Sequence, residues 1–248
     1  MQKKLKRKLA TIKKKKPYKK PYGSVSAVLT SNPNKGEKKV LDTVYDGPQW
    51  FYNEGGGTSG LKIANLMATG SSYFQRVGSK ITMVSLQLRG EINLWPPLSQ
   101  EERDPNPCLG RIIVVYDRQI NGAIPNTSNV LELRKADGTA TFDAAGGINM
   151  DFRDRFLVLW EQTIYFPAQA NANITGAVNT TTNKGHNELL VDAFIKLPNL
   201  VATFDKGTTP NPAIGDIKTG GLLVLFVTDG KTKTRNCAVF SRLRYYDN

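Results

Sequence analysis

Short stretches in which apolar and polar residues alternate, bounded by glycine, proline, asparagine or aspartate, recur along most of this 248-residue chain. The clearest stretch runs from 79 to 92 and reads SKITMVSLQLRGEI. Alternation puts its apolar side chains on one face of a strand, namely Val84, Leu86, Leu88 and Ile92. The polar side chains share the other face, namely Ser85, Gln87, Arg89 and Glu91. This period of two predicts a half-buried strand and points the body of the chain toward an all-β fold.

Further segments rich in β-branched and aromatic residues have similar lengths and similar boundaries. They predict strands at 111–117, 155–161, 188–197, 221–229 and 236–246, with weaker candidates at 40–45 and 200–204. The polar connections between these strands are long and show little helical periodicity, and the best helix candidate is a short one at 61–67. We therefore predict one all-β domain made of two packed sheets.

Several predicted strands are apolar on both faces, among them 111–117 (RIIVVYD) and 221–229 (GLLVLFVTD). A two-sheet sandwich buries only the inner face of each sheet. The second apolar face therefore needs cover from a loop, from the N-terminal segment or from another subunit. Self-association is the simplest of these explanations.

Most of the net charge of +13 lies at the N-terminus. Residues 1–20 hold eleven of the 34 Lys and Arg residues and none of the 21 acidic residues, and the first acidic residue is Glu37. The remaining 23 bases and 21 acids nearly balance. A segment so charged and so poor in apolar residues cannot offset the entropy of folding. We therefore expect a disordered basic arm over residues 1–36 and a folded shell domain over residues 37–248.

The composition of the arm favours nonspecific binding to nucleic acid through release of counterions. The positive side chains of residues 1–20, nearly all flexible lysines, are Lys3, Lys4, Lys6, Arg7, Lys8, Lys13, Lys14, Lys15, Lys16, Lys19 and Lys20. Tyr18 and Tyr22 add rings on which unpaired bases can stack, which favours single strands. The same lysine clusters match a nuclear-import signal. A merely solubilising tail and a membrane-surface helix built on Leu5, Leu9 and Ile12 remain alternatives.

Signals for catalysis, metal binding or membrane insertion are weak. The segment Gly55–Gly60 (GGGTSG) matches GxGxxG, but no acidic residue lies between Glu54 and Glu91 to bind a ribose hydroxyl. His186 is the only histidine, and the acids of 101–104 (EERD) lack the spacing of a calcium loop. No apolar run approaches the roughly 20 residues of a membrane-spanning helix. We expect no enzymatic activity, no cofactor, no metal site and no membrane insertion.

Five segments, in this order, carry a resemblance to a known family. They are RVGSKITMVSLQLRGEI (76–92), RIIVVYDRQINGAIP (111–125), DRFLVLWE (154–161), GGLLVLFVTD (220–229) and FSRLRYYD (240–247). Together with the basic N-terminus, they resemble the capsid (coat) proteins of circular, replicase-encoding single-stranded DNA viruses, the geminivirus and circovirus-like group.

This resemblance implies an eight-stranded single jelly roll that assembles as a homo-oligomer of sixty copies into an icosahedral T=1 shell. The arm would face inward onto a single-stranded DNA genome, with Lys62, Arg76 and Lys80 on the inner surface. It also implies location in the virion and in the host nucleus, with host nuclear-import receptors as further partners. The predicted function is a viral capsid protein. The alternative is a viral movement or nuclear-shuttle protein that binds single strands without forming a shell.

Overall fold

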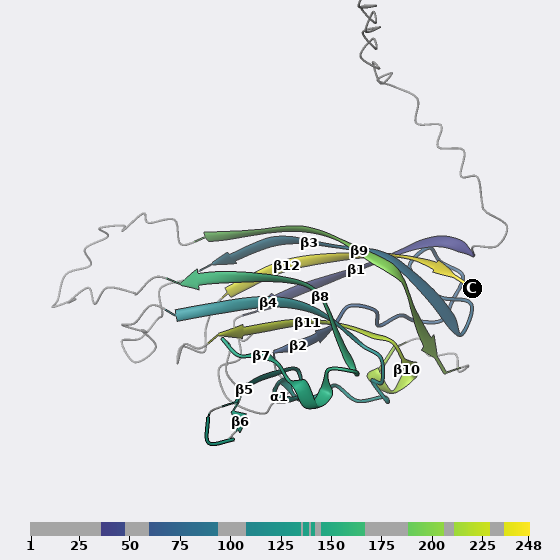
Figure 1. Cartoon of the computed structure of the whole chain (residues 1–248). Helices are drawn as coiled ribbons and strands as arrows, with labels where there is room; N and C mark the ends of the chain where they lie inside the picture. The colour runs from purple at the N-terminus through teal and green to yellow at the C-terminus, as the bar shows by residue number, and fades with distance from the viewer. Residues whose placement is uncertain are drawn as a thin grey trace, which may run out of the picture.

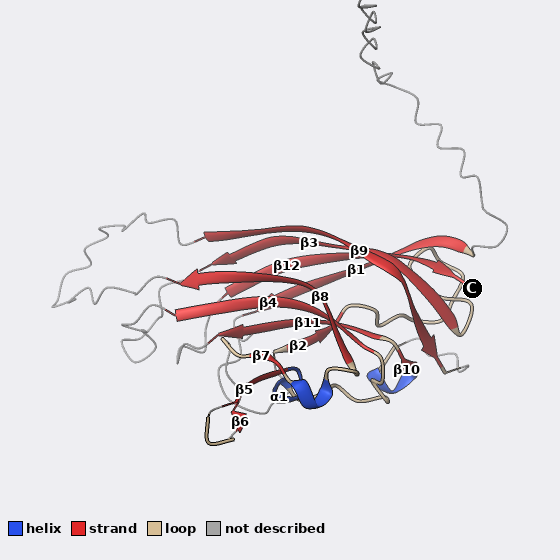
Figure 2. Ribbon diagram, in the orientation of Figure 1, coloured by secondary structure: helices blue, strands red, loops and turns tan. Residues whose placement is uncertain are grey.

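Two packed antiparallel sheets form the protein (Figures 1 and 2). The computed structural model describes residues 36–47, 60–93, 108–134, 136–138, 140–141, 145–166, 188–205, 211–228 and 236–248. The first sheet has the order β1-β12-β3-β9-β10, and its strands are β1 (Glu37–Gly47), β12 (Asn236–Asp247), β3 (Lys80–Asn93), β9 (Glu188–Phe204) and β10 (Ile217–Thr219). The second sheet has the order β2-β11-β4-β8, and its strands are β2 (Leu61–Ile63), β11 (Gly221–Thr228), β4 (Cys108–Asp117) and β8 (Phe156–Phe166).

The eight principal strands pair in a nested manner. The first strand β1 pairs with the last strand β12, and inside this pair β2 pairs with β11, β3 with β9 and β4 with β8, all antiparallel. Four nested pairs shared between two sheets are the topology of an eight-stranded jelly roll. The predicted fold class, an all-β jelly-roll sandwich, is confirmed.

The core lies between the two sheets. It includes Leu86 and Leu88 of β3, Leu243 of β12 and Phe226 of β11, all fully buried. Tyr45 of β1 meets Phe226 of the opposite sheet edge to face, with ring centroids 6.2 Å apart. A hydrogen bond also links the two sheets: the Tyr116 hydroxyl of β4 donates to the Val201 carbonyl oxygen of β9 at 2.7 Å. The inward residues of both sheets therefore form one continuous hydrophobic core.

The outer face of the β2-β11-β4-β8 sheet is covered by the long connection between β4 and β8 (Figure 1). This connection holds α1 (Thr127–Val130), β5 (Leu131–Arg134), β6 (Ala140–Thr141) and β7 (Gly147–Ile148), and we call its described residues 118–155 the cover segment. Val130 and Leu131 are fully buried and belong to the core cluster. Arg111 of β4 donates to the Gly146 carbonyl oxygen at 2.6 Å. The doubly apolar strands β4 and β11 are thus covered within the chain, and the expectation that self-association covers them is wrong.

Asp117 and Arg155 close the base of the cover segment. The guanidinium of Arg155 donates from Nε and Nη2 to the two carboxylate oxygens of Asp117 at 2.9 and 2.8 Å. This hydrogen bond to Asp117 raises the pKa of Arg155, although partial burial acts in the opposite direction. The ion pair therefore fixes the two ends of the segment side by side.

Three local expectations need correction. Residues 61–67 do not form a helix, because Leu61–Ile63 is strand β2, which pairs with β11 and satisfies the backbone of that strand. The segments 188–197 and 200–204 are one strand, β9. The alternation of β3 changes phase at a β-bulge between Met83 and Ser85, where the extra residue is Val84. Met83 is therefore buried and Val84, expected on the buried face, is only half-buried, whereas Ser85 stays on the outward face as expected and is covered there by its neighbours.

Candidate nucleic-acid interface

The residues predicted to bind nucleic acid all precede the first described residue, Gly36. The lysines, the arginine and the two tyrosines of residues 3–22 thus lie outside the described residues. Their role as a nucleic-acid-binding arm stays a prediction. The structure does describe the point from which that segment leaves the domain, which is the start of β1.

At that point the first and last strands are held together by a buried ion pair. Glu37 pairs in register with Asp247, the last residue of β12. The fully buried Lys39 Nζ lies 3.0 Å from Asp247 Oδ2 and 3.4 Å from Glu37 Oε2. The Asp247 carboxylate also accepts hydrogen bonds from the backbone N–H groups of Val77 and Gly78, at 2.7 and 3.2 Å. The end of the domain to which residues 1–35 are attached is therefore rigidly fixed.

β1 is an edge strand of the sheet whose outer face carries no described element (Figure 1). We call the outward side chains of β1, β12, β3 and β9 the open face. Strand register places them in three rows that cross the sheet: Val40, Arg244, Ser85 and Lys196; Asp42, Arg242, Gln87 and Phe194; Val44, Phe240, Arg89 and Asp192. These three rows contain four cations and two carboxylates, a net charge of +2, and the rows on either side of them add Lys38 at one end and Glu91 at the other.

Two of the four cations are neutralised by carboxylates on the same face. Arg242 donates to both carboxylate oxygens of Asp42 at 2.8 and 2.7 Å, and this pairing raises the pKa of Arg242. Arg89 donates from Nε to Asp192 Oδ1 at 3.1 Å. No described carboxylate pairs with Arg244 or Lys196. These two side chains therefore account for the excess positive charge.

Arg244 lies across β3 toward an exposed aromatic ring. Its guanidinium carbon is 6.0 Å from the centroid of Phe194, and the intervening Ser85 is only 4% exposed. The Nη1 atom of Arg244 is buried and has no hydrogen-bond partner among the described residues. Phe194 itself is 59% exposed. The open face thus combines an unsatisfied cationic donor with a ring that is open to solvent.

A second cation and ring lie beside the first on the same face. The Arg242 guanidinium carbon is 5.7 Å from the Phe240 centroid, and Phe240 is half-buried. The outward side chains Val44 and Leu190 are 62% and 75% exposed. Cations next to exposed rings suit a ligand with phosphate groups and flat bases.

The three residues expected on an inner surface have different environments. Arg76 is 2% exposed and donates to the carbonyl oxygens of Gly78 and Asp205, with its guanidinium stacked on Phe204. Burial lowers its pKa. Arg76 therefore has a structural role, since its buried guanidinium links Gly78 and Asp205, and the prediction that it lies on an inner surface is wrong. Lys62 is half-buried in β2, and Lys80 is exposed at the start of β3.

The segments weighed for other chemistry are largely beyond what the structure covers. His186, Glu101, Glu102, Asp104 and Gly55–Ser59 all lie outside the described residues. Within the described ranges, no group of three or more His, Cys, Asp and Glu side chains is arranged to hold a metal ion. None of the described helices is both long and apolar enough to cross a membrane.

Comparisons with known proteins found one weak structural likeness and no sequence relative. No protein-family profile matches the chain, and no curated protein matches its sequence. One matching solved structure is described as the native virion of Kashmir bee virus at acidic pH. It is 12% identical, the match covers 98% of this chain and 83% of that chain, and the TM-score is 0.24. At this TM-score the two backbones superpose poorly.

The open face was not among the predicted sites, although part of it has a signal in the sequence. In β9, exposed Leu190, Asp192, Phe194 and Lys196 alternate with buried residues, so a period of two identifies them as outward. The pairing of Phe194 with Arg244 needs the strand order β12-β3-β9, and no local pattern contains that order.

Proposed function

We propose that this chain is a viral capsid protein, which self-assembles into an icosahedral shell and packages a single-stranded DNA genome through its lysine-rich arm. The observation that carries the proposal is the attachment of a segment with eleven bases and no acid to the first strand of an eight-stranded jelly roll. Jelly rolls also occur in lectins and cupins, so the fold alone does not select this function. The sequence resemblance to capsid proteins of single-stranded DNA viruses supports it.

The distribution of charge supports separate roles for the arm, which would bind nucleic acid, and the folded domain, which would form the shell. Residues 1–20 of the arm carry +11, whereas the rest of the chain carries about +2, so attraction to a polyanion is concentrated in one segment. Sixty arms would supply about 660 positive charges, each able to replace a counterion of one phosphate. A genome with more nucleotides than that would retain other counterions. The arm therefore acts as a nonspecific neutraliser of the packaged strand.

The competing proposal is a movement or nuclear-shuttle protein that binds single strands and forms no shell. The same lysines and tyrosines serve both functions, and both are compatible with entry into the host nucleus through import receptors. The two proposals differ in particle size, because a shuttle protein remains a small oligomer whereas a capsid protein forms a closed shell.

The test is to express the full chain and a variant that lacks residues 1–22. Electron microscopy should show closed particles for the full chain, and the ratio of absorbance at 260 and 280 nm should report their nucleic acid. The truncated variant should give empty shells or fail to close. Equal nucleic-acid content in both preparations would show that the arm is not needed for packaging. A full chain that binds single strands without forming particles would favour the shuttle protein.

A further inference from the structure

We propose that the open face of the β1-β12-β3-β9 sheet is a second binding site for single-stranded DNA, formed by the folded domain and centred on Arg244, Lys196 and Phe194. The class of ligand rests on the proposed function. The site itself rests on contacts of the folded domain and is distinct from the N-terminal arm.

Charge complementarity is the first argument. Asp42 and Asp192 are already paired with Arg242 and Arg89, so these carboxylates repel an incoming phosphate less than free carboxylates would. Arg244 and Lys196 lie in the same cross-strand row, on either side of Ser85, and neither is paired with a described carboxylate. Nη1 of Arg244 is buried and has no acceptor among the described residues, and a guanidinium turned outward would find that acceptor in a phosphate oxygen.

The exposed ring gives the second argument. Phe194 is 59% exposed, so it can receive a base, while the guanidinium of Arg244 beside it can contact a phosphate. Stacking on an aromatic side chain requires an unpaired base and tolerates any base, because every base has a π face. This geometry therefore favours a single strand over a duplex and makes no sequence-specific contact.

The alternative occupant of an uncovered sheet face is a second copy of the chain. The centres of protein interfaces are depleted in Lys, Asp and Glu, although Arg and aromatic residues are enriched there. Here Arg244 and Lys196 are unpaired, and a two-fold contact through this row would bring these cations near their own copies. The charge distribution therefore favours a polyanion over a second subunit.

The covalent link between the arm and the open face also supports a nucleic-acid ligand for this face. The open face includes β1, and the basic segment is covalently attached immediately before that strand. A strand captured by the arm is therefore held at a high local concentration beside Phe194 and Arg244. The arm supplies long-range, salt-sensitive attraction, and the open face adds a short ordered contact.

The test measures binding of a fluorescently labelled oligodeoxythymidine to the full chain, by anisotropy across a salt series. Phe194→Ala should weaken binding by about 5- to 100-fold at high salt, where the contribution of the arm is smallest. Tyr165→Ala is the matched control, because Tyr165 is 63% exposed and lies on β8 of the other sheet. Its affinity should equal that of the unmodified chain.

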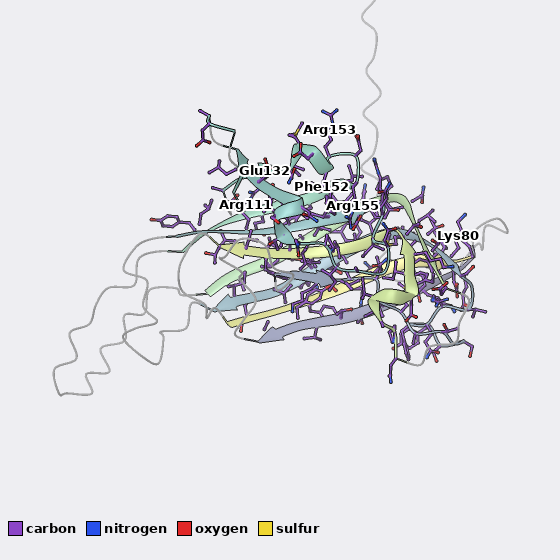
Figure 3. All side chains as sticks on the ribbon, turned by 90° about the horizontal axis from the view of Figure 1, so that it is seen from below. Lys80, Arg111, Glu132, Phe152, Arg153 and Arg155 are labelled. Atoms are coloured by element: carbon purple, nitrogen blue, oxygen red, sulfur yellow. The ribbon has the colours of Figure 1, made fainter. Side chains whose placement is uncertain are left out.

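A charge variant tests the phosphate contact separately. Arg244→Gln should reduce the slope of log K against log salt by about 0.7, the value for one phosphate on a single strand. Arg153→Gln, at an exposed position of the cover segment, is the control and should leave the slope unchanged. Figure 3 shows Arg153 on the side of the molecule that carries the cover segment, together with Phe152 and Arg155.

The possible outcomes separate this site from the proposed function. Equal affinities of Phe194→Ala and Tyr165→Ala would overturn the site and leave arm-driven packaging intact. Loss of particles in Phe194→Ala with unchanged affinity for the oligonucleotide would make the open face a contact between copies, which also overturns the site. An unmodified chain that binds no single strand at all would contradict the proposed function itself. Unchanged thermal unfolding of each variant would confirm that it folds.

Discussion

At the level of single residues, a buried ion pair lies where β1 meets β12. Lys39 is fully buried and its only described charged neighbours are Asp247 and the exposed Glu37. Removing one member of a buried ion pair leaves the other without compensation, and this loss exceeds the net stability that the pair provides. The Lys39 ammonium group therefore compensates the buried Asp247 carboxylate at this end of the β1–β12 pair.

We predict that Lys39→Ala lowers the free energy of unfolding by about 3 kcal/mol, the low end for a broken buried pair, because two backbone N–H groups still bind the Asp247 carboxylate. Urea unfolding of the unassembled chain measures the change. Lys38→Ala is the matched control on the same strand, since Lys38 is exposed, and it should change stability by less than about 0.5 kcal/mol. Equal effects of the two substitutions would show that the buried pair is unimportant.

Buried tyrosines predict a loss of stability in alkali. Burial raises the pKa of Tyr45 and of Tyr245 well above the ordinary value of about 10. Below that value both folded and unfolded chains keep the phenol protons, so stability does not change with pH through these groups. Above it only the unfolded chain loses them, so the free energy of unfolding should fall by up to about 1.4 kcal/mol per pH unit for each tyrosine.

Tyr45→Phe should therefore make the free energy of unfolding fall less steeply above about pH 10, by the amount that one buried tyrosine contributes to that slope. At neutral pH the substitution should lower the free energy of unfolding by less than about 1 kcal/mol. The Ser241 hydroxyl loses its hydrogen bond to the Tyr45 hydroxyl at 3.2 Å but can still donate to the Thr43 carbonyl oxygen. Denaturant unfolding at a series of pH values between 8 and 11 measures the slope, with Tyr165→Phe at an exposed position as the control. An unchanged slope in Tyr45→Phe would contradict the assignment.

At the scale of elements, the cover segment replaces the partner that the doubly apolar strands require. Its buried residues Val130 and Leu131 belong to the hydrophobic core, and the Asp117–Arg155 pair closes its base. The outer face of the β2-β11-β4-β8 sheet is therefore covered within one chain. Among the described elements, the uncovered sheet face is the open face.

Strand β5 offers a matched pair of substitutions to test this. Leu131 is fully buried and Leu133, on the same strand, is 40% exposed. We predict that Leu131→Ala lowers the free energy of unfolding by about 2–5 kcal/mol, because it removes buried apolar contacts and leaves a cavity. Leu133→Ala should cost less than about 1 kcal/mol. Urea unfolding of both variants measures the difference, and similar losses would mean that the segment does not contribute to the core.

The accuracy of sequence-based prediction differed between elements for physical reasons. Strands such as β3 and β11 were predictable because alternation and β-branched residues are local signals. β2 was missed because a three-residue edge strand exists only through its pairing with β11. The cover segment was read as loop because its burial comes from contact with a distant sheet. The Arg244–Phe194 contact depends on strand order in the same way.

In the whole molecule, a β-sandwich carries a basic segment ahead of its first strand. The sandwich has one covered sheet and one uncovered sheet, and the basic segment is attached at the edge of the uncovered one. An assembly that encloses a polyanion needs a folded wall and a concentrated source of positive charge. We therefore expect shell formation and nucleic-acid content to be properties of the same particle.

Sedimentation velocity of the purified full chain, recorded at both 260 and 280 nm, measures particle size and nucleic-acid content together. We predict one large species of about 1.6 MDa in protein, corresponding to sixty chains of 27.4 kDa, with nucleic acid sedimenting in the same boundary. A single chain or small oligomer near neutral pH, with no nucleic acid in its boundary, would contradict it.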